Sequence, residues 1–340
     1  MPRPRHHLVP QTYLRRFADN KSRVVLVDRD DLAHTVRTGT KNACAEVGFY
    51  DWTPDLDPAS PPLEPGADDA EFIEKAFSVF ESRASGPISR LLASGAPPSD
   101  EDRYDLANIL ALQITRTNRF REDLTAMGTW AARRHWMESL DDEKVAALLR
   151  EQGRPDSPAD VRAFIEEVTG PGGPRLVPDK AFTIQQSIGT ALGTFVRALW
   201  QRQWVVVRFE QPSILTSDEP VVAWHPEDEP VTAVNAPIVW VPMGRQHVLQ
   251  LMPSSHHDTS RVGTQREADH INSLVATQAD RWIVHHPDDT ALVARLDLGP
   301  RTAWGEEVLE RVVETDGIRE TGRYRRLPVP PAPETDWSVG

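Results

Sequence analysis

The chain has 340 residues and a mass of 38.1 kDa, with ten tryptophans and a formal net charge of −13. This length suits one large domain or two small ones, and the aromatic content argues against wholesale disorder. The acidic balance argues against nucleic acid as a partner of the whole surface. No apolar run approaches the roughly 18–20 residues that span a bilayer, and a single cysteine, Cys44, excludes an intrachain disulfide. These features predict a cytoplasmic protein without a membrane partner.

The N-terminal part of the chain predicts mainly helices. A β-branched run predicts a strand at residues 23–28, with 34–37 as its partner, and prolines with acids at 54–65 predict a surface loop. Apolar residues at three-to-four spacing, together with capping residues, predict helices over 70–92, 100–124, 141–152, 157–168 and 180–200.

Beyond residue 200 the pattern changes to short β-branched runs. They predict strands at 204–209, 213–216, 221–224, 237–241, 247–251 and 282–285, and a helix at 264–279. The fold class is therefore α+β, with a mainly helical N-terminal part and a short antiparallel sheet in the C-terminal half. We expect a single domain over residues 1–326, helical over about 66–200 and sheet over about 201–300, followed by a proline-rich disordered tail at 327–340.

Several segments carry unusual patterns. Residues 6–17 read His-His-x-x-Pro-x-x-Tyr-Leu-x-x-Phe, and residues 41–50 end in Phe-Tyr. A predicted helix carries two glutamates seven apart, the next carries Gln-Ile-Thr-Arg-Thr-Asn-Arg at 113–119, and residues 216–221 read Thr-Ser-Asp-Glu-Pro-Val. Together these segments resemble a bacterial family named domain of unknown function 4238, in which Asn is commoner than Glu in the last motif. The resemblance implies a fold-level grouping and candidate positions, but no reaction.

The adjacent histidines His6 and His7 are the first candidate site residues. Adjacent side chains cannot share one face of a helix, and in a strand they point to opposite faces, so one of them can face a given site. Imidazole suits zinc, manganese or iron, and it also suits acid–base work near neutral pH. The alternative is an N-terminal arm that docks on the core, with one histidine bonded to a carboxylate.

Glu74 and Glu81 are the second pair of candidates. Seven residues of helix separate them by about 10 Å along the axis, so they cannot both hold one metal ion. Arg116 and Arg119 on the next helix are the expected partners in an antiparallel helix pair. Such an inter-helix ion pair is one interpretation, and a buried acid held for catalysis is the other.

Gln113 and Asp218 complete the candidate set. Gln113 follows Ile109 by four residues and is expected to point inward, either as a satisfied core amide or as a ligand-facing group. Asp218 lies in a turn between two predicted strands. It either caps its own backbone or meets the histidine pair as a metal ligand or as a group that orients one.

Two functions fit this set, and the sequence leaves open whether the protein is an enzyme. It contains no phosphate-binding glycine loop, no dinucleotide fingerprint, no nucleophile elbow and no His-Glu-x-x-His. The first hypothesis is a metal-assisted hydrolase of small phosphoester-type substrates, with a divalent ion as cofactor. Its site would gather His6, His7, Glu74, Glu81, Gln113, Arg116 and Asp218, with His6, His7 and Asp218 as metal ligands. The second is a non-catalytic binding or regulatory protein in which the same side chains form a structural network.

Overall fold

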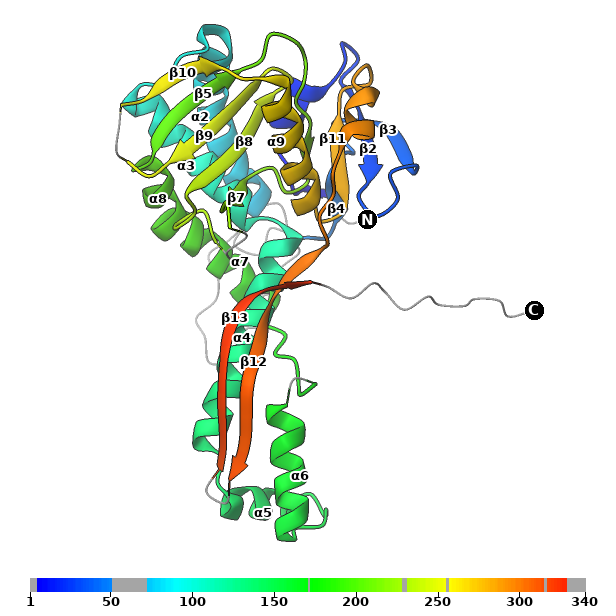
Figure 1. The fold of residues 1–340 in the computed structure, drawn as a ribbon, viewed down its shortest axis with the longest axis vertical. Coiled ribbons are helices and arrows are strands. Elements are labelled where there is room, and N and C mark those ends of the chain that lie inside the picture. Colours follow the sequence, from blue (N-terminus) through cyan, green and yellow to red (C-terminus); the bar gives the residue numbers. More distant parts are fainter. Residues whose placement is uncertain are drawn as a thin grey trace, which may run out of the picture. The chain divides into compact units, whose positions relative to one another are not determined.

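The computed structural model describes residues 5–50, 72–170, 172–227, 231–254, 257–314 and 317–328 (Figure 1). These residues form two compact units. Unit 1 comprises the described residues of Met1–Arg121 and Asp179–Gly299, and unit 2 those of Glu122–Pro178 and Pro300–Gly340. Where the sequence predicts one domain over 1–326, contacts group the chain into these two units. Unit 1 alone contains every predicted site residue.

The helical layer of unit 1 contains α2 (Phe72–Ser94), α3 (Asp100–Thr115), α7 (Lys180–Thr190) and α8 (Val196–Trp200), with one π-helical turn at Ala191–Phe195 joining the last two. Ser99 caps α3, because its hydroxyl accepts from the backbone N–H of Asp102. The predicted helix over 100–124 is broken after Thr115, and α4 (Asn118–Ser139) begins beyond the break. Thr117 explains the break, since its hydroxyl accepts from the N–H of Phe120 and so begins a new helix.

Three sheets of described residues complete unit 1. The first has the order β10-β5-β9-β8-β7, the second has the order β3-β2-β11-β6, and the third is the two-stranded pair of β1 (Arg5–His7) and β4 (Ala45–Val47). All pairs are antiparallel except β10 with β5, which is parallel, so the expected antiparallel sheet is mixed at one edge. The strands are β2 (Arg23–Asp28), β3 (Thr35–Gly39), β5 (Gln203–Arg208), β6 (Thr216–Ser217), β7 (Val222–Trp224), β8 (Ile238–Gly244), β9 (His247–Met252), β10 (Thr259–Val262) and β11 (Trp282–His285).

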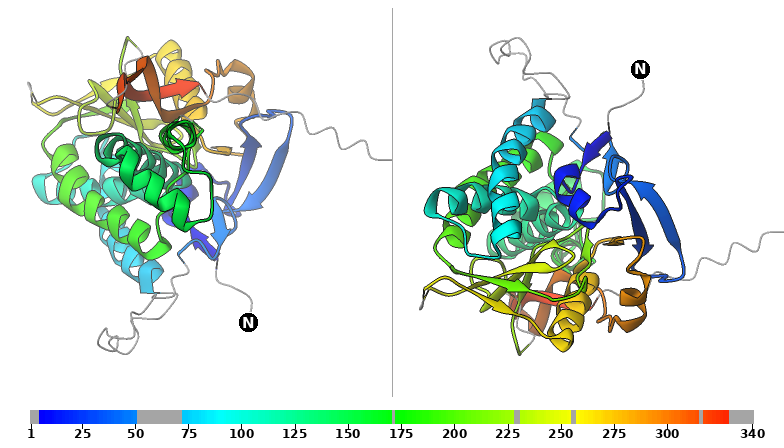
Figure 2. Two further views of the ribbon diagram at one scale, coloured as in Figure 1. Left: turned by 90° about the horizontal axis from the view of Figure 1, so that it is seen from below. Right: turned by 90° about the horizontal axis from the view of Figure 1, so that it is seen from above.

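The five-stranded sheet is covered on both faces. Trp204 and Val206 of β5 pack with the helical layer, whereas Val205 and Val207 pack on the opposite side, with α9 (Gln265–Gln278) and the second sheet. Figure 2 shows this arrangement, with α9 on the side opposite the helical layer. A strand that is buried on both faces reads as a continuous apolar run, which is why residues 204–207 lack alternation.

Unit 2 contains most of α4 together with α5 (Asp142–Glu151), α6 (Pro158–Thr169) and a hairpin of β12 (Thr302–Glu314) and β13 (Gly317–Pro328). Ser157 and Asp160 form a capping box at the start of α6, as the Ser-Pro signal in the sequence predicts. The predicted tail at 327–340 lies outside the described residues except for 327–328, which end β13. No described helix has the length and apolar character needed to cross a membrane.

Candidate functional site

The N-terminal segment from Arg5 to Phe17, called the arm below, is part of the core. Its strand β1 (Arg5–His7) pairs with β4 (Ala45–Val47), and its helix α1 (Gln11–Leu14) begins after Pro10. Leu14 and Phe17 are fully buried, so the apolar spacing read from the sequence is the spacing of side chains that pack inward.

The carbonyl oxygen of Leu8 joins the arm to α3. It accepts from Gln113 Nε2 at 3.0 Å and from Arg116 Nε at 2.9 Å. Arg116 is 2% exposed and donates from Nη1 to Glu81 Oε1 at 3.1 Å, which ties α3 to α2. The predicted pairing of the two helices through Arg116 is therefore present. Arg119, the other expected partner, lies in α4 and donates to the carbonyl of Gln278 instead.

Gln113 is left with an unused acceptor. Its Nε2 must face Leu8 because a carbonyl oxygen only accepts, and this fixes the orientation of the amide. The amide oxygen Oε1 is buried and has no hydrogen-bond partner among the described residues. A buried acceptor without a partner costs about 1–3 kcal/mol, so this oxygen calls for a group that donates to it.

The two histidines point to different partners. His6 is buried, and its Nδ1 accepts from the N–H of Tyr50 at 2.9 Å. His7 is partly exposed, and its Nδ1 lies 3.2 Å from Glu74 Oε1 while its Nε2 lies 3.1 Å from the carbonyl oxygen of Lys41. Both oxygens are acceptors, so a hydrogen bond to either one needs a proton on the ring nitrogen that faces it.

The Glu74 carboxylate is held in its charged form by its neighbours. Burial acts to raise the pKa of Glu74, but the hydrogen bond from His7 and the positive charge of Arg116 outweigh it and leave the pKa below its usual range. Arg116 therefore acts on two carboxylates, Glu81 through a hydrogen bond and Glu74 through its charge.

Asp218 caps a strand. Its carboxylate accepts from the backbone N–H groups of Asp280, Arg281 and Trp282 at 2.8–2.9 Å, at the beginning of β11. Burial raises the pKa of Asp218 to about 6, while these three donors act to lower it. Asp218 therefore caps backbone groups that lie 62 to 64 residues away, and not the backbone of its own turn, as one interpretation of the sequence had it. Within the turn it is the Ser217 hydroxyl that accepts from the N–H of Glu219.

The seven candidates are therefore only partly brought together. Glu81, Gln113 and Arg116 share one network with the arm, and His7 with Glu74 forms a neighbouring pair. In the ranges that the structure describes, no three His, Cys, Asp or Glu side chains gather so as to hold a metal ion. The predicted ligand set of His6, His7 and Asp218 is not assembled there, because each side chain is engaged by other groups: Tyr50 for His6, Glu74 and Lys41 for His7, and the start of β11 for Asp218.

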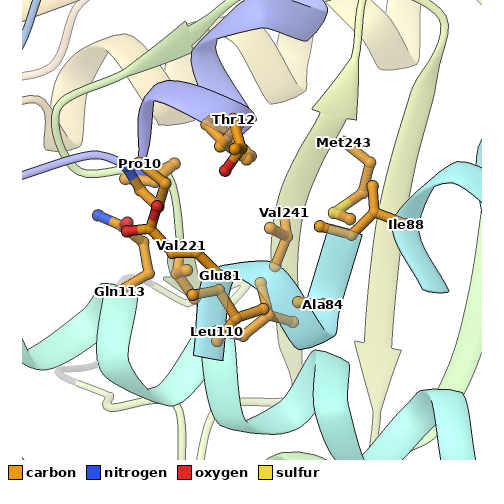
Figure 3. A pocket seen from close by; sticks show the side chains of 13 residues that line it. Pro10, Thr12, Glu81, Ala84, Ile88, Leu110, Gln113, Val221, Val241 and Met243 are labelled. Carbon is orange, nitrogen blue, oxygen red and sulfur yellow. The ribbon is translucent and has the colours of Figure 1, made fainter. Parts of the chain in front are cut away.

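A pocket lies beside the Leu8 network (Figure 3). Its empty space comes to about 410 Å³ when the part open to solvent is counted, so this figure is not the volume of a closed cavity. Its lining comes from the arm (Pro10, Thr12, Tyr13), α2 (Glu81, Ala84, Ile88), α3 (Ile109, Leu110, Gln113), the turn before β7 (Pro220, Val221) and β8 (Val241, Met243). Figure 3 shows Glu81 and Gln113 near Pro10 at one end, and Ile88 with Met243 at the other.

Sequence reasoning missed the polar role of Tyr13. Its hydroxyl donates to the carbonyl of Pro242 at 2.6 Å and lies 2.8 Å from the hydroxyl of Thr216. Burial raises the pKa of Tyr13 well above its usual value. The signal available in the sequence was the choice of Tyr where Phe would serve on an apolar face.

Glu219 is a second residue that sequence reasoning missed. It is buried next to the pocket residues Pro220 and Val221, and its Oε1 has no hydrogen-bond partner among the described residues. Burial raises its pKa well above the usual range, although the charge of Arg119 lowers it. The sequence marks this position, since Glu stands there where the family resemblance implies Asn.

The fold and the pocket define an α+β protein with a mostly apolar pocket between its helical layer and its sheet. Residues 5–289 match the family model described as Protein of unknown function (DUF4238), so the chain belongs to that family. This match confirms the resemblance drawn from the motifs, and it includes every residue that lines the pocket. Comparisons with curated proteins and with solved structures found no match.

Proposed function

We propose that the protein binds a small organic molecule in this pocket, and that the polar network beside it holds the arm as one wall. The proposal rests on one observation, which is that segments far apart in the sequence meet at one pocket. The arm, α2, α3 and the turn before β7 each carry one of the distinctive sequence patterns, and all four contribute to one pocket. A fastening network alone requires no cavity, whereas a binding site requires one.

The chemistry of the lining fits a small molecule with one polar end. Ligand sites are mostly apolar with a few placed polar groups. The pocket has aliphatic side chains along most of its wall and the unused Gln113 oxygen at one end. We therefore expect a compact ligand with a short apolar body.

A metal-assisted hydrolase of phosphoesters, using a divalent ion, is the second proposal. The partly exposed His7–Glu74 pair favours it, because an imidazole held by a carboxylate suits acid–base work. Against it, the Arg116 charge is committed to Glu81 and Leu8, so a phosphoester would have to compete with protein groups for it. Metal analysis of the purified protein, with a panel of phosphatase and phosphodiesterase substrates, tests this proposal.

The binding proposal is tested by filling the pocket. Ala84 lines the pocket and is 1% exposed, so in Ala84→Leu the larger side chain must extend into the cavity. Ala93→Leu makes the same change at an exposed position of α2. We expect isoamyl alcohol to give saturable NMR shift changes with the wild type and with Ala93→Leu, but not with Ala84→Leu. Equal binding to all three, or no binding to the wild type by any of isoamyl alcohol, isoamylamine and isovalerate, would contradict the proposal.

A further inference from the structure

We infer that the polar end of the ligand is a hydrogen-bond donor, and specifically a protonated primary amine. This inference rests on the proposed function, because it concerns the ligand of the same pocket. The evidence is the set of polar atoms that line the pocket. For each atom we consider whether it donates or accepts hydrogen bonds and whether it already has a partner.

The first acceptor is Gln113 Oε1. The residue is 5% exposed, its Nε2 is committed to the Leu8 carbonyl, and its Oε1 is unpartnered among the described residues. The amide cannot turn over to offer a donor instead, since that would place two acceptor oxygens against each other. This position of the lining therefore presents a fixed acceptor to a ligand.

The second acceptor is Glu81. Its Oε1 accepts from Arg116 Nη1, and its side chain is 19% exposed where it lines the pocket. Its second carboxylate oxygen makes no hydrogen bond to a described residue, so it is available to a donor. Figure 3 places Glu81 and Gln113 at the same end of the pocket, so one head group is able to meet both.

Among the side chains that line the pocket, no other supplies a strong donor. Arg116, whose Nη2 is buried without a partner among the described residues, is not one of the lining side chains. The Tyr13 hydroxyl donates its one proton to Pro242, so the Thr216 hydroxyl must be the donor in the Tyr13–Thr216 bond. Of the lining side chains, the Thr12 hydroxyl is left as a group that either donates or accepts. A carboxylate or phosphate in this pocket would face acceptor oxygens and a negative charge, which is costly in a partly buried site.

The negative charge of Glu81 favours a cation over a neutral donor. Arg116 is bonded to Glu81, but its single positive charge also acts on Glu74, so one guanidinium serves two carboxylates. A primary ammonium carries three N–H donors, and a charge-assisted hydrogen bond to a carboxylate is stronger than one from a neutral hydroxyl. The aliphatic wall formed by residues such as Ile88 and Met243 then covers the rest of the molecule.

Three compounds with the same carbon count test the inference at neutral pH: isoamylamine, isoamyl alcohol and isovalerate. We expect the amine to bind the wild type at least tenfold more tightly than the alcohol, and isovalerate to show no saturable binding. Binding of isovalerate as tight as that of the amine would overturn the inference and leave the proposed function standing. If none of the three binds, the proposed function fails and the inference fails with it.

Two substitutions test whether Gln113 gives the preference for the amine over the alcohol. Gln113→Met keeps the length of the side chain and removes the acceptor, so the amine should bind no more than about twofold more tightly than the alcohol, while the alcohol still binds. Gln203→Met is the matched control, because Gln203 is also 5% exposed with an unpartnered Oε1 but lies outside the pocket lining. It should keep the tenfold preference.

Glu81→Gln provides a second variant if Gln113→Met fails to fold. It keeps an acceptor for Arg116 and removes the negative charge, so amine binding should weaken at least fivefold while alcohol binding is unchanged. An undiminished amine preference in the folded variant of either residue would overturn the inference.

Discussion

At the scale of residues, Leu8 shows how one backbone carbonyl organises a site. Two side chains from α3 donate to it, and one of them also carries the ion pair to α2. Arg116 is almost fully buried, and its Nε and Nη1 are hydrogen-bonded, whereas its Nη2 has no partner among the described residues. Removing one member of a buried pair leaves the charge of the other without compensation. Its removal should therefore cost more than the loss of a surface pair.

We expect Arg116→Met to lower the free energy of unfolding by about 3–5 kcal/mol, because it leaves the Glu81 carboxylate without its partner. Arg90→Met is the matched control. Arg90 pairs with Asp102 between the same two helices but is 64% exposed, so its loss should cost about 1 kcal/mol or less. Urea unfolding followed by circular dichroism measures both. Small and equal effects would show that the Arg116 pair is not a buried one.

The His7–Glu74 pair predicts a dependence of stability on pH. A carboxylate whose pKa is lower in the folded state stabilises the fold above its unfolded pKa, about 4.5 for Glu, and stops doing so as pH falls through its folded pKa. We expect His7→Gln to be less stable than the wild type by about 1 kcal/mol at pH 6, and the difference to shrink as the pH falls below about 4. His34→Gln, which removes a more exposed pair with Asp28, should show little difference at either pH. If the difference in free energy of unfolding between His7→Gln and the wild type does not change with pH, the stabilisation does not come from the lowered pKa of Glu74.

At the scale of elements, the arm is a structural element of unit 1. It contributes a strand, a helical turn and several fully buried side chains, and it supplies three residues of the pocket wall. Because the wall and the core packing belong to the same segment, displacement of the arm would open the pocket and expose apolar surface together.

Leu14→Ala tests the packing of the arm. Leu14 is fully buried, so the truncation should lower the free energy of unfolding by about 2–5 kcal/mol. Val79→Ala is the control, since Val79 on α2 is 57% exposed and its truncation should change stability by about 0.5 kcal/mol or less. Thermal melts of the two variants compare them directly. A Leu14→Ala melt equal to that of Val79→Ala would mean that the arm is not packed as described.

At the scale of the whole molecule, unit 1 is built from two stretches of chain and holds every proposed site residue. Its last residues are anchored within the unit, because Arg29 donates to the carbonyl of Gly299 and the Gly299 N–H donates to the hydroxyl of Thr277. The hairpin of β12 and β13 follows this anchor and belongs to unit 2.

We therefore expect a chain ending at residue 299 to keep a cooperative melt and to bind isoamyl alcohol as the full chain does. A chain ending at residue 278 is the contrasting control. It lacks β11, which pairs with both β2 and β6 and accounts for the N–H groups that Asp218 caps, so it should not fold cooperatively. Near-ultraviolet circular dichroism and NMR titration distinguish the two chains. Loss of binding in the longer chain would show that the pocket depends on residues beyond 299.

What the sequence by itself determined about this protein is local. Apolar spacing and caps predicted most of the helices and strands and the α+β class, because these signals depend on neighbouring residues. Local signals do not show the burial of Arg133 in α4. The side chain is 6% exposed, and its Nε donates to the carbonyl of Thr169, a partner that lies 36 residues away.

The motifs likewise pointed to the residues of the Leu8 network, but not to their roles. Only the tertiary structure decided that Asp218 caps β11 and that Gln113 and Glu81 line one pocket with the arm. The physical reason is that a side chain with several possible partners takes the one that folding brings near. Those partners lie 35 to 108 residues away for the Leu8 network and 62 to 64 residues away for Asp218. Separations of this kind leave no trace in local periodicity.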